Sequence, residues 1–251
     1  MLKVVMISRA TLHTVKGGDT VQIMQTARQL ALHGINVDLK LTDEAIDYAR
    51  YDLLHFFNLT RPADILYHIE KSGKPFVVSP ILVDYSEYDK YYRKGMAGIF
   101  FRLLPANTIE YFKTLVRWIR GRDKLMSLSY AWKGQRKSIR EVLTKAELLL
   151  PNSRSEYNRV AQQYKRQINY RIVPNGIDPI LFQCDVSIKK DPLLVICVAR
   201  IEGIKNQLNL IRALNGTAYR LLIIGSPAPN QLSYYRACRR LAMPNITFIE
   251  H

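Results

Sequence analysis

The sequence predicts an α/β protein with two parallel sheets. Short runs that are apolar throughout recur along its 251 residues, and the segments between them carry apolar residues at helical spacing. Strands that are apolar throughout are buried on both faces, and when they alternate with helices the natural arrangement is a parallel sheet. The alternation occurs in two series, which predicts two Rossmann-like, doubly wound domains.

The first series begins at the N-terminus. Its expected strands cover residues 3–8, 35–41, 51–57, 74–80, 146–151 and 170–174. Helices are expected at 20–34 and 62–73, each ending in a glycine, the residue favoured just past a helix end. Apolar residues at helical spacing predict the buried face of the first helix, which consists of Val21, Met24, Ala27, Leu30 and Ala31.

The second series contains fewer elements. Its expected strands cover residues 192–199, 219–225 and 245–250. Residues 176–192 hold two prolines and show no periodicity. We therefore expect an interdomain linker there, between a domain at 1–177 and one at 178–251. A doubly wound domain normally has about five or six strands, so the sequence is expected to be cut off inside its second domain.

The balance of charged residues is unusual. Thirty-seven Lys and Arg against 21 Asp and Glu give a formal net charge of +16, while the hydrophobic fraction of 48% is ordinary for a soluble globular protein. A positive field of this size attracts anions. Nucleic acid, anionic lipid headgroups and phosphorylated substrates all remain open as partners on this ground.

Cysteine usage and apolar run lengths indicate the compartment. Cys184, Cys197 and Cys238 are odd in number and widely spaced. Neither a disulfide framework nor a zinc site is expected from them, which fits a reducing cytosol. The N-terminal apolar core is too short for a signal peptide, and no run approaches the ~18 apolar residues that a spanning helix needs. The protein is expected in the cytoplasm or on the cytoplasmic surface of a membrane.

Two glycine-containing loops are candidate binding elements. Gly17 and Gly18 follow the first strand and precede a helix. Glycine permits close approach of a ligand, and the free N–H groups of the helix favour an anion. The full dinucleotide fingerprint is missing, and a plain loop turn is the alternative. Asn175 and Gly176, in "IVPNGID", form a tight turn between the domains that would lie at an interdomain cleft.

Two further residues have a structural and a functional interpretation. Ser153 and Glu156 match the S-x-x-E capping box of a helix start, so a structural role is expected for Glu156. His55, in the third expected strand, would reach the cleft if it were an acceptor-side residue. The alternative is that His55 is a structural histidine of the sheet.

The stretch "VARIEGIKNQ" places two cations where a buried strand meets a helix. Arg200 and Lys205 would lie at the carboxyl end of the strand, where ligands of open α/β sheets bind. Arginine holds phosphate oxygens in a fork, lysine adds a point charge, and the helix adds its N-terminal dipole. Gly225 and Ser226 repeat the arrangement at the next strand end and would let a nucleotide approach.

Several of these motifs, in this order, resemble the family 4 retaining glycosyltransferases, which have the GT-B fold. The matching stretches are "KGGDTVQIMQTARQLALHGINVDL", "LLLPNSRSE", "IVPNGID", "VARIEGIKNQLNLIRAL" and "RLLIIG". The resemblance implies that Arg200 and Lys205 bind the donor diphosphate and act as the catalytic groups. It also implies that Gly17, Gly18, Asn175, Gly176, Gly225 and Ser226 line the donor side of a cleft.

The sequence also departs from that family's pattern. The glutamate-rich segment that holds the donor sugar and ribose is absent, and so is the C-terminal helix that returns to the first domain. The family's histidine after the fourth strand is replaced by "VVSPILVDYSEYD", in which neither Ser79 nor Asp84 can be assigned a role.

The resemblance implies a metal-independent, retaining transfer of a sugar from a nucleotide-sugar donor to a glycan or lipid-linked acceptor, as in cell-envelope polysaccharide synthesis. No cofactor is expected, because the cations can stabilise the leaving diphosphate themselves. A sugar-phosphate-forming synthase would differ only in its acceptor. The alternative from another class is a non-catalytic, GT-B-derived binding or membrane-associated module.

Residues 90–140 are strongly basic. They hold 13 Lys and Arg and two acids, with aromatic residues interleaved. In "EYFKTLVRWIR", Phe112, Leu115, Val116 and Ile119 share one side and the cations the other, which suits a helix lying on an anionic membrane surface. An ordinary surface helix is the alternative. No nucleic-acid-binding motif accompanies the charge, so no nucleic acid is expected as a partner.

Overall fold

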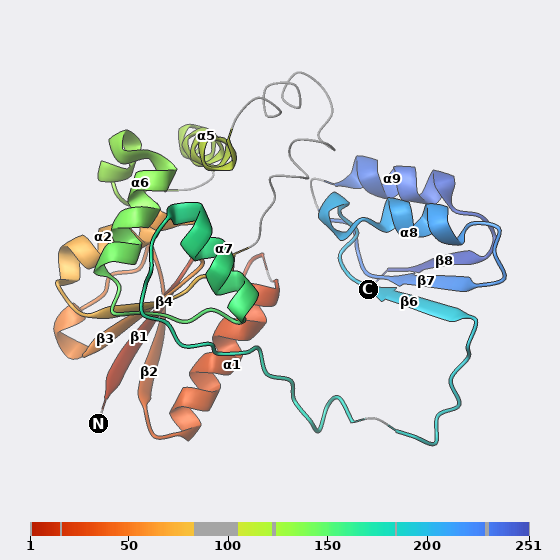
Figure 1. The fold of residues 1–251 in the computed structure, drawn as a ribbon, viewed down its shortest axis with the longest axis horizontal. Helices are drawn as coiled ribbons and strands as arrows, with labels where there is room; N and C mark the ends of the chain where they lie inside the picture. The colour runs from red at the N-terminus through yellow and green to blue at the C-terminus, as the bar shows by residue number, and fades with distance from the viewer. Residues whose placement is uncertain are drawn as a thin grey trace. The chain divides into compact units, whose positions relative to one another are not determined.

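The computed structural model describes residues 2–15, 17–82, 105–121, 124–183, 185–228 and 231–250. Asp84, Cys184 and part of the basic segment lie outside the described residues. The described chain divides into two compact units, with the division after Ile177, and each is described by itself (Figure 1).

The first unit is built on a five-stranded parallel sheet. Its strands are β1 (Lys3–Ser8), β2 (Asn36–Leu41), β3 (Leu53–Phe57), β4 (Phe76–Ser79) and β5 (Leu148–Leu149). They lie in the order β2-β1-β3-β4-β5, and every neighbouring pair is parallel. The chain therefore reverses its direction of winding between β1 and β3, which is the switch point of a doubly wound sheet.

Helices cover both faces of this sheet. The helical elements of the unit are α1 (Gly18–Leu32), the 3₁₀ turn η1 (Tyr48–Arg50), α2 (Pro62–Ser72), α5 (Ala106–Ile119), α6 (Ser129–Lys145) and α7 (Arg154–Tyr164). Of these, α5 packs against α6. Alternate residues of β1 enter two separate cores. Val4 and Met6 pack with Ile23 of α1, whereas Val5 and Ile7 belong to the larger core that includes residues of α2, α6 and α7. The apolar strands are thus buried on both sides, as a doubly wound sheet requires.

The ends of α2 follow from its sequence. Pro62 occupies the first helical turn, where a missing N–H costs nothing, and Gly73 ends the helix with a left-handed φ of 59°. The buried face of α1 agrees with the prediction in part, since Ala27 and Leu30 pack against the core that holds Val4 and Met6. Ile23 is buried, whereas Val21 and Met24 are 62% and 47% exposed. Because α1 carries apolar residues on more than one side, spacing alone could not show which of them meets β1.

The capping prediction at α7 is confirmed. The Ser153 hydroxyl accepts a hydrogen bond from the Glu156 amide at 3.2 Å. The buried Glu156 carboxylate accepts bonds from the amides of Asn152 and Leu82, both at 2.7 Å. Glu156 therefore ties the start of α7 to the segment after β4. Beyond α7, the strand expected at 170–174 is reduced to a bridge between Leu149 and Tyr170.

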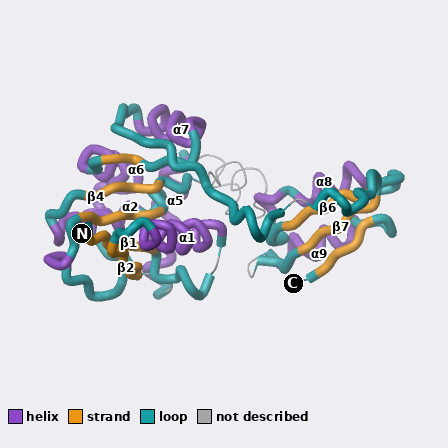
Figure 2. Tube along the Cα trace, turned by 90° about the horizontal axis from the view of Figure 1, so that it is seen from below, coloured by secondary structure: helices purple, strands orange, loops and turns teal. Residues whose placement is uncertain are grey.

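The second unit is a smaller parallel sheet. Its elements are β6 (Leu194–Val198), η2 (Gly203–Lys205), α8 (Gln207–Leu214), β7 (Arg220–Ile224), α9 (Leu232–Leu241) and β8 (Ile246–Ile249). The strands are parallel in the order β6-β7-β8, and Figure 2 shows β6 beside β7. Residues of α8 and α9 pack on one face of the sheet, around Ile211, Ile223 and Cys238 (Figure 1). On the opposite face Ile196 and Val198 are 53% and 74% exposed.

No helix within the described residues combines the length and the apolar character needed to cross a bilayer.

Candidate functional site

The carboxyl edge of the β6–β7 pair brings Arg200 and Ser226 together. The ladder continues past both strands, because the amides of Ala199 and Ile201 donate to the carbonyls of Ile224 and Ser226, each at 3.0 Å. Val198 pairs with Ile224 and Ile201 with Pro227. This constant register sets Arg200 directly opposite Ser226.

Gly225 occupies a position in this edge that only glycine fits. Its φ is +145°, and a Cβ placed on it would lie 2.2 Å from the Ala199 carbonyl oxygen. Its own amide donates to the Ile249 carbonyl at 2.9 Å. The absence of a side chain lets the β6 and β7 backbones approach at the edge where Arg200 emerges.

Arg200 is exposed but already has an acidic neighbour. Its Nη2 lies 3.2 Å from the Oε1 of Glu202, with the arginine side chain 48% exposed and the glutamate 15%. A pair this exposed is worth about 0–1 kcal/mol. A doubly charged ligand can therefore displace Glu202 at little cost.

Lys205 ends the η2 turn, where its side chain is exposed. Its amide donates to the Glu202 carbonyl at 2.9 Å. Asn206 then takes a left-handed φ of 58°, and α8 begins at Gln207. The chain between strand and helix is thus a short turn that carries one cation at each end.

Gln207 is a residue that the sequence analysis missed. Its side chain is fully buried, and Nε2 donates to the Arg200 carbonyl at 2.9 Å. Its Oε1 is buried without a hydrogen-bond partner in the described structure. The available signal was a polar residue at the first position of α8, directly before the apolar Leu208. The side chain holds the backbone of Arg200 against the start of α8.

In the first unit, Gly17 and Gly18 form the start of α1. Gly17 is the N-cap with extended backbone, and its amide donates to Thr20 Oγ1 at 3.1 Å. A Cβ on Gly17 would come within 2.9 Å of Asp19 Oδ1, whereas a Cβ on Gly18 would meet open space. The helix start already holds a carboxylate, that of Asp19 in the first turn.

Arg9 organises this loop. Its guanidinium binds Asp19 through Nε at 2.8 Å and Nη2 at 3.2 Å, and donates to the carbonyls of Thr11 and Val15, both at 2.7 Å. Burial raises the pKa of the Asp19 carboxyl, but the bonds and charge of Arg9 outweigh it and leave that pKa below its ordinary value. Sequence analysis did not find this pair.

His55 lies inside β3, two residues before its end. It is 5% exposed, hydrogen-bonds Ser79 Oγ through Nε2 at 2.9 Å, and stacks on Phe57 with ring centroids 4.2 Å apart. Burial lowers the pKa of His55 to about 3, so the imidazole is neutral near pH 7. These contacts suit a structural histidine, and the acceptor-side role stays a prediction. Asn175 and Gly176 are exposed in irregular chain near the end of the first unit.

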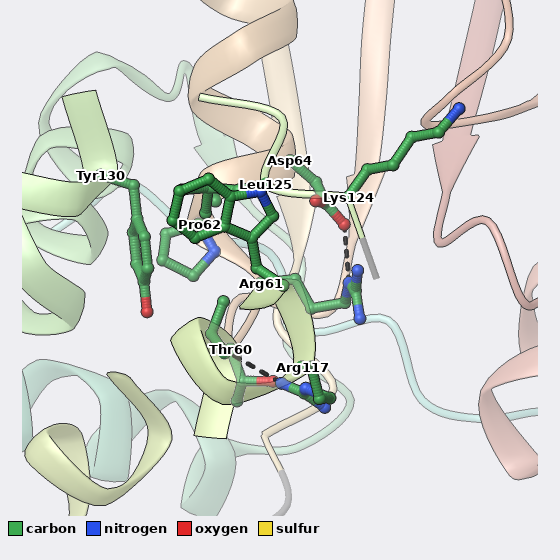
Figure 3. A pocket seen from close by; sticks show the side chains of 11 residues that line it. Thr60, Arg61, Pro62, Asp64, Arg117, Lys124, Leu125 and Tyr130 are labelled. Atoms are coloured by element: carbon green, nitrogen blue, oxygen red, sulfur yellow. Dashed lines mark hydrogen bonds and ion pairs between the residues drawn. The ribbon is translucent and has the colours of Figure 1, made fainter. Parts of the chain in front are cut away.

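The first unit also has a pocket among its helices. It lies between the loop after β3, the end of α5 and the start of α6 (Figure 3). The atom-free space is about 340 Å³ and includes open solvent. Its lining residues are Thr60, Arg61, Pro62, Ala63, Asp64, Thr114, Arg117, Trp118, Lys124, Leu125 and Tyr130.

Comparison with solved structures identifies the fold of the chain as the GT-B fold of glycosyltransferases, with a second domain that is partial beside theirs. Anabaena Alr3699/HepE in complex with UDP and glucose matches with a TM-score of 0.60 and 12% identity, over 100% of this chain and 69% of that one. Sucrose-phosphate synthase from Thermosynechococcus elongatus gives a TM-score of 0.68 at 12% identity, over 100% of this chain and 71% of that one.

The apo form of the lipopolysaccharide outer core galactosyltransferase WaaB gives a TM-score of 0.52 at 12% identity, over 99% of this chain and 68% of that one. No family model matches the chain, and no curated protein matches it. At these identities the likeness shows the fold, so the two-domain α/β prediction is confirmed at the level of architecture.

Proposed function

We propose that this chain belongs to a glycosyltransferase that moves a sugar from a nucleotide-sugar donor to a glycan or glycolipid acceptor. The observation that carries the proposal is the placement of Arg200, Lys205 and the start of α8 at the carboxyl edge of a parallel sheet, within a GT-B fold. HepE, which shares that fold, was solved with UDP and with UDP-glucose. This supports a nucleotide sugar as the donor.

The chemistry that we assign to this edge is stabilisation of the departing diphosphate. Negative charge builds on the leaving group as the sugar–oxygen bond breaks, and fixed cations lower the barrier by meeting that charge. Arg200 supplies a fork of donors, Lys205 a mobile ammonium, and α8 the positive end of its dipole. Gly225 and Ser226 leave room beside them. Each cation is worth about 2–4 kcal/mol of barrier, by comparison with an oxyanion-hole donor.

Two finer features belong to the proposal. Because two cations and a helix dipole can neutralise the leaving group, the transfer is metal-independent. The acceptor attacks from the side that the diphosphate leaves, so the sugar keeps its anomeric configuration. In the first unit, the loop at Gly17 and Gly18 and the turn at Asn175 and Gly176 are assigned to lining the site.

We also assign α5 to contact with an anionic membrane surface, on its cytoplasmic side. Phe112, Val116 and Ile119 recur at helical spacing on α5 and are 40%, 42% and 76% exposed. Trp118 and Arg117 lie beside them and are also exposed. Exposed apolar residues flanked by cations and an indole suit the interface of a bilayer rather than bulk water.

The test is a calorimetric titration of the chain with UDP and UDP-glucose. Arg200→Ala and Lys205→Ala should each weaken UDP binding by about tenfold or more, since each removes a charged hydrogen-bond donor. Arg212→Ala is the matched control, because Arg212 is an arginine of α8 that bonds Asn209 on the helix surface. UDP affinity that ignores both site substitutions would contradict the proposal.

Two measurements of turnover test whether the transfer retains the anomeric configuration and whether it is independent of metal. The anomeric configuration of the product, read by NMR, should equal that of the donor. Activity should persist in excess EDTA.

A further inference from the structure

The pocket of the first unit has a rigid polar frame. The Tyr130 hydroxyl donates to Gln135 Oε1 at 2.6 Å, and Gln135 Nε2 donates to the Thr60 carbonyl at 2.8 Å. Thr60 Oγ1 in turn bonds Asn58 Oδ1 at 2.5 Å, where Asn58 holds a left-handed φ of 70°. This chain of bonds fixes the loop after β3 against α6. A pocket held by such a network is pre-organised for a ligand.

The position of the pocket also favours ligand binding. Thr60 and Arg61 lie in the loop that follows β3, three and four residues past its end, and β3 is one of the two strands at which the sheet reverses its winding. In open α/β sheets the carboxyl ends of strands at this switch point form the usual crevice for ligands.

The lining of the pocket is positively charged. Arg61 and Asp64 form an ion pair of 2.6 Å with side chains 20% and 12% exposed. Arg117 is exposed, and its Nη2 bonds a hydroxyl, Thr114 Oγ1, at 3.2 Å. Figure 3 shows the guanidinium groups of Arg61 and Arg117 on the same side of the pocket, while the Lys124 ammonium points away from it. The lining residues thus include three cations, with Lys124 as the third, and one carboxylate, so the lining carries a net positive charge that favours an anion.

Two aromatic residues belong to the remaining lining. Tyr130 is fully buried, and burial raises the pKa of its phenol to about 12, so the ring carries no charge. Trp118 is 44% exposed. The atom-free space of about 340 Å³ includes open solvent, so a ligand can reach these residues from the surface. Flat apolar walls with a few fixed polar groups are typical of small-ligand sites.

We infer that this pocket binds an anionic saccharide, a sugar that carries a phosphate or a carboxylate. The negative group lies on the Arg117 guanidinium beside Arg61, where charge-assisted hydrogen bonds are strongest, and the sugar ring packs on the Trp118 indole. The inference rests on the proposed function for the role of this ligand, which is the acceptor of the transfer. The binding itself requires no donor.

The experiment uses Trp118 as its own reporter. The chain has two tryptophans, and Trp132 is 79% exposed and outside the pocket lining, so Trp132→Phe leaves Trp118 as the single fluorophore. The full chain carrying Trp132→Phe is titrated with glucose 6-phosphate, glucuronate, inorganic phosphate and glucose. Glucose 6-phosphate or glucuronate should change the emission saturably, at concentrations at least tenfold below those needed with glucose or inorganic phosphate.

Substitutions then locate the anion. Arg117→Ala should raise the half-saturating concentration about tenfold or more, as expected for a lost hydrogen bond to a charged group. Arg117→Lys keeps the charge and should therefore retain part of the affinity. Arg120→Ala is the matched control, because Arg120 caps the same helix and lies outside the lining. Its effect should be below about twofold, within the range of an exposed charge.

Several outcomes would overturn the inference. If glucose binds as tightly as glucose 6-phosphate, the site does not require an anionic group. If inorganic phosphate binds as tightly as glucose 6-phosphate, the site does not require a saccharide. If Arg117→Ala leaves the affinity unchanged, or if binding requires vesicles of phosphatidylglycerol, the saccharide does not bind in this pocket. Because UDP binding is titrated separately through Arg200, the pocket and the proposed donor site can fail independently of each other.

Discussion

Gly225 lies so close to Ala199 that a Cβ on the glycine would sit 2.2 Å from the alanine carbonyl oxygen. No side chain fits there unless β6 and β7 move apart, and the φ of +145° is itself strained for any other residue. The edge that carries Arg200 and Ser226 therefore depends on this glycine for its geometry. The same glycine that would let a nucleotide approach is first a requirement of the fold.

Gly225→Ala should destabilise the second unit by about 3 kcal/mol, the sum expected from backbone strain and overpacking. The measurement is urea unfolding followed by circular dichroism. Gly18→Ala is the control, since a Cβ there would meet nothing within 4 Å and alanine favours a helix. An unchanged midpoint for Gly225→Ala would show that the two backbones do not approach as described.

Glu202 competes with any anion for Arg200. The exposed pair between Arg200 Nη2 and Glu202 Oε1, at 3.2 Å, must open before a diphosphate takes the guanidinium. Glu202→Gln removes the negative charge and keeps the size of the side chain, so UDP should bind up to about fivefold more tightly, the factor that corresponds to the ~1 kcal/mol upper value of such a pair. Calorimetry measures the change. Weaker binding would instead mean that Glu202 contacts the ligand.

The prediction for α5 concerns vesicles of phosphatidylglycerol. Replacing Phe112, Val116 and Ile119 together by serine should weaken sedimentation with such vesicles by about 10–100-fold, because three exposed apolar side chains lose their transfer into the interface. Serine at Val21 and Leu32, which are 62% and 70% exposed on α1, makes a matched control. An equal loss of vesicle binding in both variants would contradict the assignment of α5 as the membrane-contacting helix.

The strands could be predicted from the sequence, because short runs that are apolar throughout and alternate with helical patterns are typical of a parallel sheet with both faces covered. β1 and β3 fall inside the expected ranges. The face of α1 was predicted only in part. Ala27 and Leu30 pack against the core as expected, but Ile23, rather than the equally apolar Val21, belongs to that core. β5 covers only two residues, and on its other side Leu149 exchanges hydrogen bonds with Asn169 and Arg171.

The part of the candidate site that lies at the ends of β6 and β7 could be predicted from the sequence. The rule that parallel strands end at one edge predicted that Arg200 and Ser226 would lie together. The ion pair between Glu202 and Arg200 could not be predicted in this way. It depends on the directions of the two side chains, which the spacing of residues in the sequence does not determine. The pocket of the first unit was missed for a related reason. Arg61 and Arg117 belong to different helical segments, and only tertiary packing brings them to one lining.

Two buried histidines should make the first unit sensitive to mild acid. Burial lowers the pKa of His55 to about 3 and that of His68 to about 4, from an ordinary value of 6.5. His68 also bonds the Tyr48 hydroxyl at 2.7 Å and Thr42 Oγ1 at 3.1 Å. In the unfolded chain both imidazoles take up a proton as the pH falls through 6.5, whereas the folded chain keeps them neutral.

The sign follows from this difference in proton uptake. A histidine whose folded pKa is lowered contributes stability that is complete above the unfolded value and is lost as the pH falls. The free energy of unfolding should therefore decrease steadily between pH 6.5 and pH 4, the window set by His68, and continue to decrease toward the pKa of His55. Urea unfolding at a series of pH values measures the slope. His68→Gln and His55→Gln should each flatten it, while His33→Gln, which changes an exposed histidine, should not.

NMR titration gives the direct check, since a His55 ring resonance that shifts between pH 6 and 7 would contradict the neutral, buried imidazole and would reopen an acid–base role for it.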